Sequence, residues 1–374
     1  MNININIKEI ASNYDFKGDL INYKPYGSGH INDTYLLVFK NAKLELEKVV
    51  LQRINKTVFK KPVEVMENII GITGYLREQI IKQGGNPERE TLNVIPARDG
   101  RFYYIDSNEE YWRFYKYIEN TTSYEQVERP EDFYESGVAF GRFQYLLANY
   151  PANTLYETIP GFHDTKARFQ KFKEAVANDV CGRAKTAQTE IDFVLARQDV
   201  SEVFWDLQEK GEIPLRVTHN DTKLNNIMMD NETGKGICVV DLDTVMPGLA
   251  MNDFGDSIRF GASTGAEDEQ DLTKISCDLE LFELYAKGFI EGCNNSLTNK
   301  EIELLPMGAK VMTFECGMRF LTDYLEGDHY FKIHREGHNL DRCRTQFKLV
   351  ADMEKKWNEM NEVILALFKR DSDS

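Results

Sequence analysis

Alternating and continuous apolar runs dominate the first third of the chain, and such runs are typical of β-strands. A turn at residues 27–29 separates the first two of them. Apolar residues at helical spacing in 63–81 predict a helix, which Gly71 and Gly74 weaken. The predicted strands are two within residues 23–39, a third at 47–54, and a final hairpin of 101–105 and 111–118. Residues 1–117 are therefore predicted to form a small, five-stranded unit with one helix.

The rest of the chain has apolar residues at helical spacing. Pro130 suits the first turn of a helix. Thr298 and Glu301 have the spacing of a capping box, and Pro306 must end or kink the helix that follows. The predicted helices are residues 130–147, 164–178, 189–210, 279–290, 308–325 and 339–368. Residues 118–374 are therefore predicted to form a larger, mainly helical unit.

One stretch between these helices has the residues that phosphoryl transfer requires. His219, Asp221 and Asn226 form the pattern H-x-D-x-x-x-x-N, and an apolar run then ends at Asp241 and Asp243. In kinases a carboxylate meets the acceptor hydroxyl, while an Asn and a second carboxylate bind Mg²⁺ against the ATP phosphates. The 20 residues from 221 to 241 are enough for a hairpin that delivers Asp241 to the metal. An ordinary turn rich in Asp and Asn would require no such spacing.

Composition narrows the class of partner. The 374 residues carry a formal net charge of −16, which disfavours nucleic acid and anionic membranes as partners. The six cysteines include no C-x-x-C pair, so reduced thiols are expected. The first residues lack the pattern of a signal peptide, and no apolar run is long enough to cross a bilayer. The sequence therefore predicts a cytoplasmic protein, either a monomer or a homodimer.

Several motifs resemble those of a known family, the N-acetylhexosamine 1-kinases. They belong to the aminoglycoside phosphotransferase/choline kinase group, which has a protein-kinase-like fold. The motifs are residues 26–32 (YGSGHIN), 219–226 (HNDTKLNN), 240–248 (VDLDTVMPG) and 252–261 (NDFGDSIRFG), with further likeness at 112–119 (WRFYKYIE), 315–328 (ECGMRFLTDYLEGD) and 342–350 (RCRTQFKLV). The resemblance implies a two-lobed α+β fold, with an N-lobe of residues 1–117 and a C-lobe of residues 118–374. It also implies transfer of phosphate from ATP, with Mg²⁺, to the C1 hydroxyl of N-acetylglucosamine or N-acetylgalactosamine.

The catalytic roles follow from the motif. Asp221 is the candidate base for the acceptor hydroxyl, and Asn226 and Asp241 are the candidate Mg²⁺ ligands. His219 is expected to position the catalytic loop. Asp253 lies in a D-F-G triplet, but it follows a Pro-Gly loop and lies 32 residues after Asp221 (221 to 253). By resemblance it supports the catalytic loop and does not bind metal.

The nucleotide side departs from the protein-kinase pattern. A lysine that binds the phosphates usually follows V-A-I, whereas this chain has Gln52 after Val49, Val50 and Leu51. Sequence alone leaves open which cation, if any, meets the α- and β-phosphates. The predicted nucleotide-binding residues are Gly27, Ser28 and Gly29 in the turn, Val50 and Gln52 on the third strand, and Tyr117, Ile118 and Glu119 in the connector between lobes.

The sugar-binding residues are inferred only from the resemblance. They are His30, Asp243, Arg319 and Tyr330. A second metal contact is the rival role for Asp243. Other acceptors of the same superfamily, namely an aminoglycoside, choline or homoserine, remain alternatives for the substrate. A pseudokinase that binds nucleotide without transferring phosphate is a further alternative, and Gln52 is its only support.

Overall fold

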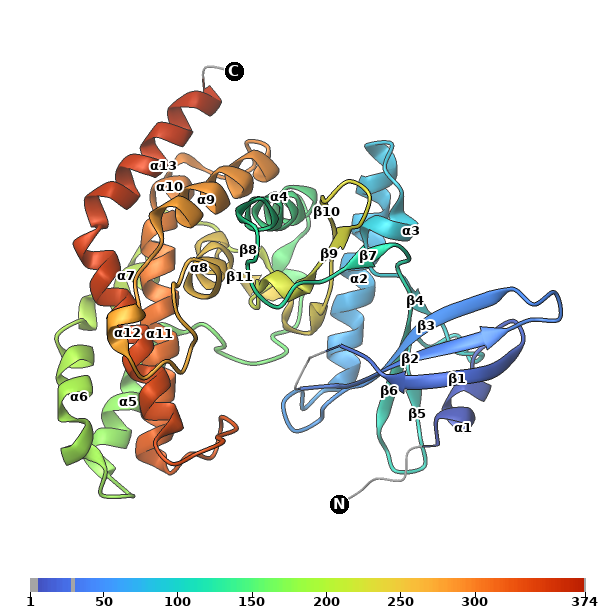
Figure 1. Cartoon of the computed structure of the whole chain (residues 1–374), viewed down its shortest axis with the longest axis horizontal. Helices are drawn as coiled ribbons and strands as arrows, with labels where there is room; N and C mark the ends of the chain where they lie inside the picture. Colours follow the sequence, from blue (N-terminus) through green and yellow to red (C-terminus); the bar gives the residue numbers. More distant parts are fainter. Residues whose placement is uncertain (1–5, 28–30, 373–374) are drawn as a thin grey trace.

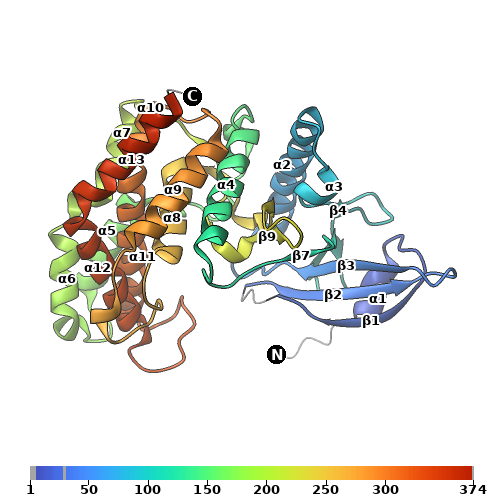
Figure 2. The same cartoon turned by 45° about the horizontal axis from the view of Figure 1, so that its top comes forward.

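The computed structural model describes residues 6–27 and 31–372. An antiparallel sheet from the first third of the chain lies beside a larger helical part (Figure 1). A hairpin of β9 (Ile227–Asp230) and β10 (Gly236–Val239), with the short strand β7 (Thr121–Thr122), lies between them in both views (Figure 2). The mixed α+β class predicted from the sequence is confirmed.

The N-terminal sheet has six strands in the described residues, in the order β1-β2-β3-β6-β4, with β5 also pairing with β6. They are β1 (Asp19–Pro25), β2 (Asp33–Lys40), β3 (Leu46–Arg53), β4 (Val94–Ile95), β5 (Tyr104–Ile105) and β6 (Tyr111–Lys116). The prediction of five strands missed β4, because a strand of two residues is too short to show an alternation of apolar and polar side chains. The prediction of one helix is likewise incomplete: α1 (Ile7–Ser12) and the four-residue α3 (Pro87–Glu90) join the predicted helix.

The predicted helix is α2 (Pro62–Lys82), which has Pro62 in its first turn and continues through both glycines. Its apolar face packs in one continuous core with the C-terminal helices. The sheet has a separate, smaller core, in which residues of α1 pack against Leu37, Leu51 and Phe114. The division of the chain at residue 117 stays a prediction, because the larger core includes α2.

The C-terminal part is mainly helical. Its α-helices are α4 (Pro130–Leu146), α5 (Thr165–Asn178), α6 (Gln188–Leu195), α7 (Gln198–Glu209), α8 (Ala250–Gly261), α9 (Leu279–Cys293), α10 (Asn299–Glu303), α11 (Leu305–Glu326), α12 (His338–Lys355) and α13 (Trp357–Ser372). The capping box of Thr298 and Glu301 is present, and α10 ends before Pro306, which lies in the first turn of α11.

Two long predicted helices are each interrupted, so those predictions were wrong. Residues 189–210 form α6 and α7, and the break contains Arg197, which pairs with Glu354 and lies over the Phe193 ring. Residues 339–368 form α12 and α13, and Lys356 between them donates to the carbonyl of Cys277. At both breaks a residue contacts another that is distant in the sequence. The periodicity of apolar residues within a helix gives no information on such contacts.

Helices α4 and α9 pack closely through glycines on both. A Cβ atom added to Gly141 would lie 2.2 Å from the carbonyl oxygen of Phe289, and one added to Gly288 would lie 2.2 Å from that of Tyr134. This contact fixes α4, whose other residues reach the catalytic loop. None of the helices in the described part of the chain is both long enough and apolar enough to cross a bilayer.

Candidate active site

The catalytic loop lies between two small antiparallel pairs of strands. It leaves β8 (Arg216–Thr218), which pairs with β11 (Met246–Gly248), and it leads into the β9–β10 hairpin. The backbone N–H of Val240 donates to the carbonyl of Asn226 at 2.9 Å. This bond places Asp241, the next residue, beside the end of the loop. The structure thus contains the hairpin that the spacing predicted.

Asp221 has one partner for each carboxylate oxygen. Lys223 Nζ lies 2.7 Å from its Oδ1, and Asn226 Nδ2 donates to its Oδ2 at 3.2 Å. Burial tends to raise the pKa of Asp221, but the charge of Lys223 and the nearby His219 and Arg259 outweigh it, so the pKa is lowered. The side chain is still 27% exposed. Asp221 is therefore an ionised carboxylate that a substrate hydroxyl can reach.

Sequence reasoning missed Lys223. Its signal is its position two residues after Asp221, which lets the ammonium group bend back to the carboxylate. The charge of Asp221 raises the pKa of Lys223 despite burial, so it is a cation at neutral pH. It places positive charge beside the candidate catalytic carboxylate.

Asp253, in the first turn of α8, binds the backbone of the catalytic loop. Its carboxylate accepts hydrogen bonds from the N–H groups of His219 at 2.9 Å and Asn220 at 2.8 Å, and from Gln144 of α4 at 2.8 Å. Burial raises its pKa, and these hydrogen bonds oppose the rise. These contacts favour the predicted role of Asp253, in which its carboxylate holds the catalytic loop and does not bind metal.

His219 is fully buried against α4. Its ring lies edge-on to Phe140 and Phe143, with centroids 5.5 and 6.1 Å away. Its Nε2 lies 2.9 Å from the carbonyl oxygen of Val240. The ring thus connects the catalytic loop to the strand before Asp241, which favours the positioning role predicted for it.

Asp221, Asp241 and Asp243 form a group of neighbouring acids. Asp241 has a positive φ of 60°, a backbone conformation that few residues other than Gly, Asn and Asp adopt. Burial, followed by the charges of Asp243 and Asp221, raises the pKa of Asp241 to about 6. A divalent cation would relieve this repulsion, and the amide nitrogen of Asn226 is directed at Asp221, which leaves its oxygen for a metal.

The donor set therefore fits Mg²⁺. No group of three or more His, Cys, Asp or Glu residues forms a metal site within residues 6–27 and 31–372. Mg²⁺ does not require one, because it keeps several waters and commonly uses one or two carboxylates together with substrate phosphates.

The Gln52 side chain hydrogen-bonds an arginine. Its Oε1 accepts from Arg113 Nη2 at 2.9 Å and from Arg113 Nε at 3.2 Å, and its Nε2 donates to Thr34 at 3.1 Å. Arg113 on β6 lies directly opposite Gln52 in the sheet register and is fully buried. Sequence reasoning missed it, although an arginine within the apolar run of residues 112–118 was a signal.

Two residues of the N-terminal part bind the carboxylate of Asp243. Arg113 Nη1 lies 2.6 Å from its Oδ1, and Asn32 Nδ2 donates to its Oδ2 at 2.6 Å. The Asp243 side chain is only 2% exposed. Its predicted contact with sugar stays a prediction.

The connector between the two parts follows β6. Tyr117 lies edge-on to Tyr26, with ring centroids 6.0 Å apart, and Ile118 is buried. Glu119 pairs with Lys48 of β3 at 3.0 Å. Val50 is half-buried and lies opposite Tyr115 in the register. Of the predicted phosphate turn, Gly27 is described and has a φ of 78°, whereas Ser28 and Gly29 lie outside the described residues. His30, predicted to bind the sugar, also lies outside them.

Arg319 lies in an aromatic cluster. Its guanidinium is 5.4 Å from the ring centroid of Phe162, 5.8 Å from Tyr330 and 5.5 Å from Phe331. Tyr330 is 64% exposed, so its hydroxyl-bearing ring is open to solvent. Arg319 and Tyr330, which the resemblance selected separately, are therefore brought together by the fold.

This cluster reaches the catalytic loop through His163, the residue after Phe162. His163 Nε2 lies 3.4 Å from the carbonyl oxygen of Asn220, and its Nδ1 lies 2.9 Å from Glu315. Burial raises the pKa of Glu315, but His163, Arg168 and Arg319 reverse this and lower it to about 2. Neither Phe162 nor His163 was predicted, and no motif marks them.

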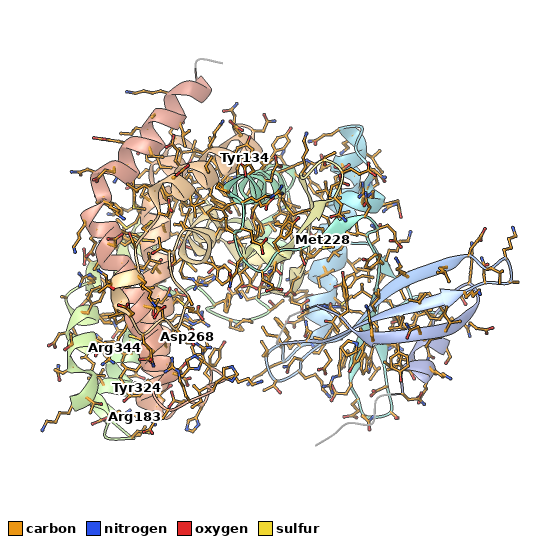
Figure 3. The ribbon with its side chains drawn as sticks, viewed as in Figure 1. Tyr134, Arg183, Met228, Asp268, Tyr324 and Arg344 are labelled. Carbon is orange, nitrogen blue, oxygen red and sulfur yellow. The ribbon has the colours of Figure 1, made fainter. Side chains whose placement is uncertain are left out.

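The segment that bears Tyr330 is anchored by two acids. Asp323 accepts from the N–H groups of His329, Tyr330 and Phe331. Asp328 pairs with Arg183, whose guanidinium lies 4.7 Å from the Tyr324 ring; Figure 3 shows Arg183 and Tyr324 side by side. The exposed ring thus stands on a fixed backbone.

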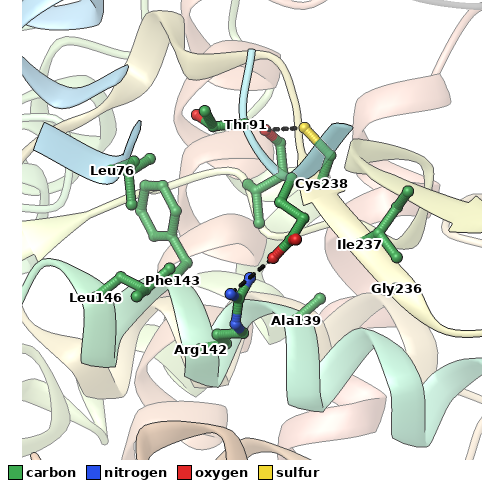
Figure 4. Close-up of a pocket in the computed structure, with 11 residues that line it drawn as sticks. Leu76, Thr91, Ala139, Arg142, Phe143, Leu146, Gly236, Ile237 and Cys238 are labelled. Carbon is green, nitrogen blue, oxygen red and sulfur yellow. Dashed lines mark hydrogen bonds and ion pairs between the residues drawn. The ribbon is translucent and has the colours of Figure 1, made fainter. Parts of the chain in front are cut away.

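A separate small cavity lies between α2, α4 and β10 (Figure 4). Phe143 and Leu146 line it, and the ion pair of Arg142 with Glu90 at 2.8 Å lies at its wall. None of the candidate site residues lines this cavity, so it is distinct from the site described above.

The sheet, the helical part and the acidic loop between them define the class of fold, which is protein-kinase-like. Solved structures with the same fold include a microcompartment-associated aminopropanol kinase, with a TM-score of 0.60, 15% identity, and 95% of this chain and 97% of that chain covered. A choline kinase from Cryptosporidium parvum Iowa II has a TM-score of 0.59, 15% identity and coverage of 97% and 98%. An amicoumacin kinase in complex with AMP-PNP and Ca²⁺ has a TM-score of 0.56, 14% identity and coverage of 94% and 92%.

A family model identifies the group more closely. Residues 22–277, more than half of the chain, match the phosphotransferase enzyme family. The chain belongs to this family. The predicted superfamily and its phosphotransferase activity are therefore confirmed, while the hexosamine member within it stays a prediction.

Proposed function

We propose that this protein transfers the γ-phosphoryl group of MgATP to the anomeric C1 hydroxyl of N-acetylglucosamine or N-acetylgalactosamine. The observation that carries the proposal is the convergence of Asp221, Asn226 and Asp241 next to a cluster built around Arg319. The family supports the transfer chemistry. The choice of sugar rests on the motifs at residues 29–32, 243–248 and 317–321.

Asp221 accepts the proton of the acceptor hydroxyl. Its ionised state is maintained by Lys223, and Asn226 fixes its second oxygen, so the carboxylate is oriented before the acceptor arrives. The ring oxygen of a sugar makes the anomeric hydroxyl more acidic than its other hydroxyls, which makes this proton transfer less demanding. Mg²⁺ bound by Asn226 and Asp241 would neutralise charge on the β- and γ-phosphates.

The acceptor lies over the aromatic cluster in this proposal. Arg319 and Tyr330 donate to hydroxyl and acetamido oxygens, with the aromatic rings as an apolar floor. Asp243 can still accept, because a carboxylate has about four lone-pair sites and each oxygen has one partner here. His30 supplies a further hydrogen bond. C1 then faces Asp221.

ATP lies along β3 and the connector. Val50 and Ile118 contact the adenine, and the backbone of Tyr117, Ile118 and Glu119 supplies its hydrogen bonds. The backbone N–H groups of residues 27–29 approach the phosphates, and Gln52 lies on the same face of the strand as Val50.

An ATP-consumption assay over a panel of acceptors tests the proposal. N-acetylglucosamine and N-acetylgalactosamine should stimulate ATP use, whereas their methyl glycosides, blocked at C1, should not. A ³¹P–¹H correlation spectrum of the product should show coupling to H1, and coupling to the H6 pair would refute the regiochemistry. Turnover with only an aminoglycoside, choline or homoserine would establish one of the alternatives. Nucleotide binding without any turnover would establish a pseudokinase.

A further inference from the structure

Arg113 is a buried cation in the sheet that no motif explains. Its side chain is fully buried, yet it carries a permanent charge, because a guanidinium does not lose its proton in proteins. It sits one strand away from Gln52, the neutral residue at the usual position of the phosphate-binding lysine. A buried charge of this kind is costly unless it is paired.

The partner of Arg113 is in the other part of the molecule. Its Nη1 lies 2.6 Å from Asp243 Oδ1, while Gln52 accepts from its Nε and Nη2. The guanidinium fork thus spans β3 and the turn that follows Asp241. A lysine has a single point charge and could not make this set of contacts.

Asn32, the residue before β2, is a second side chain of the N-terminal part that binds Asp243. Its Nδ2 donates to Asp243 Oδ2 at 2.6 Å, and its Oδ1 accepts from the N–H of Asn55 at 3.0 Å, which fixes the amide orientation. On the other side, Thr158 donates to the backbone carbonyl of Asp243 at 2.8 Å. Asp243 is therefore constrained by three donors, and two of them come from the N-terminal part.

We propose that Arg113 is a positioning residue of this site: it fixes Asp243, and with it residues 241–244, against the N-terminal sheet. This inference rests on the proposed function, because the acceptor is what Asp243 is positioned for. The polar groups of Arg113 are directed at Gln52 and Asp243, so its assigned role is to hold these side chains. The ion pair of Arg113 with Asp243 connects β6 to residues 241–244, the turn that contains Asp241. Protein kinases instead use an ion pair between a lysine of the third strand and a glutamate of the helix that follows it. Here the two glutamates near the start of α2 bind elsewhere: Glu64 pairs with Lys61, and Glu67 interacts with the Tyr156 hydroxyl.

Hydrogen exchange tests the positioning role without any activity measurement. In Arg113→Met, peptides covering residues 31–36 and 240–248 should exchange faster than in the wild type. Arg53→Met is the matched control, because Arg53 lies on the neighbouring strand and pairs with Asp33 instead of Asp243. Since Asp33 itself lies in residues 31–36, the two variants are compared at residues 240–248. Unchanged exchange there in Arg113→Met, or an equal increase there in the control, would overturn the proposal.

Kinetics test its consequence. Arg113→Met should lower kcat/KM for the acceptor by about 10²-fold, as expected when a reacting group is displaced by roughly 1 Å. The Kd of MgADP, measured by calorimetry, should change far less. A larger effect on MgADP than on the acceptor would instead make Arg113 a nucleotide-binding group and would overturn the positioning role.

Two further variants keep the test decisive if Arg113→Met does not fold. Arg113→Lys keeps the charge without the fork. Asn32→Ala removes the neutral donor to Asp243, together with the acceptor for the N–H of Asn55. Both variants should increase exchange in 240–248 and weaken acceptor turnover. If exchange in residues 240–248 and acceptor turnover are both unchanged from the wild type in the two variants, the inference is overturned. Failure of the wild type to use any acceptor would refute the proposed function, and the exchange data would still decide the position of Asp243.

Discussion

At Asp221, two opposing effects decide the protonation state. Burial is the largest single effect and favours the neutral acid. The ammonium of Lys223 at 2.7 Å, together with His219 and Arg259, favours the carboxylate, and their combined effect lowers the pKa of Asp221. The base is thus ready at neutral pH, but its basicity is reduced. A reduced basicity suits an acceptor hydroxyl that is itself more acidic than an ordinary alcohol, and the anomeric hydroxyl is of that kind.

Asp221→Asn should keep the shape of the side chain and remove the proton acceptor. We expect kcat to fall by about 10²–10⁴-fold, the usual contribution of a positioned base, while the Kd of the sugar changes much less. Steady-state kinetics and calorimetry measure the two effects. A kcat close to that of the wild type would remove Asp221 from the role of base.

Glu315 provides a pH test beside the site. Its folded pKa, about 2, is lower than its ordinary value of 4.5. A lowered pKa contributes stability above the unfolded value, and that stability is lost as the pH falls through the folded value. Glu315→Gln should therefore lose on the order of 3 kcal/mol of unfolding free energy at pH 7. Urea denaturation at several pH values should show the difference shrinking below about pH 4.5, and a constant difference would contradict the assignment.

Two acids on different elements separate metal binding from loop support. Asp253 on α8 accepts two backbone N–H bonds from the catalytic loop, so Asp253→Asn should cost roughly 1–3 kcal/mol of stability. Asp241→Asn should leave the protein folded and abolish Mg²⁺-dependent turnover. Thermal denaturation and Mg²⁺ titration of activity distinguish them. Rescue of the Asp253 variant, and not of the Asp241 variant, by added Mg²⁺ would reverse the two roles.

The contact of α4 with α9 depends on residues without a Cβ atom. Gly288→Ala would place that atom 2.2 Å from the carbonyl oxygen of Tyr134, so the helices must separate, at a cost of roughly 1–3 kcal/mol. Gly74→Ala in α2 is the matched control: its added Cβ meets nothing within 4 Å, and it should stabilise by up to about 1 kcal/mol. Denaturant unfolding measures both. Equal stability of the two variants would show that α4 and α9 can adjust freely.

Sequence patterns predicted the elements whose residues repeat regularly, such as α2 and β3. They could not predict the break at Arg197, because the ion pair with Glu354 comes from a helix far along the chain. The site divides in the same way. Spacing along one hairpin identified Asp221 and Asp241, whereas Arg113 became visible only through its register opposite Gln52 and its contact with Asp243.

Across the whole molecule, the candidate site lies where the two parts meet. Asn68 of α2 donates to the carbonyl groups of Tyr156 and Val245, and Asp243 binds residues of β6 and of the segment before β2. The larger core includes α2, while the sheet has a core of its own. Tyr115 of β6 belongs to the larger core, and Val50 and Val94 pack against it. Apolar packing and buried polar contacts therefore both connect the sheet to the catalytic part, close to where ATP is proposed to bind.

A nucleotide that contacts both parts should therefore stabilise the whole protein. We expect AMP-PNP with Mg²⁺ to add about 2.7 kcal/mol at a free concentration of about 100 times its Kd, which corresponds to a rise in Tm of several degrees. EDTA should remove most of this gain, because the phosphates and the carboxylate of Asp241 would then repel each other. Asp241→Asn is the matched control, since it should show a smaller gain and little response to EDTA. An equal shift with and without Mg²⁺ in the wild type would contradict metal-dependent binding at Asp241, and no shift at all would contradict nucleotide binding between the two parts.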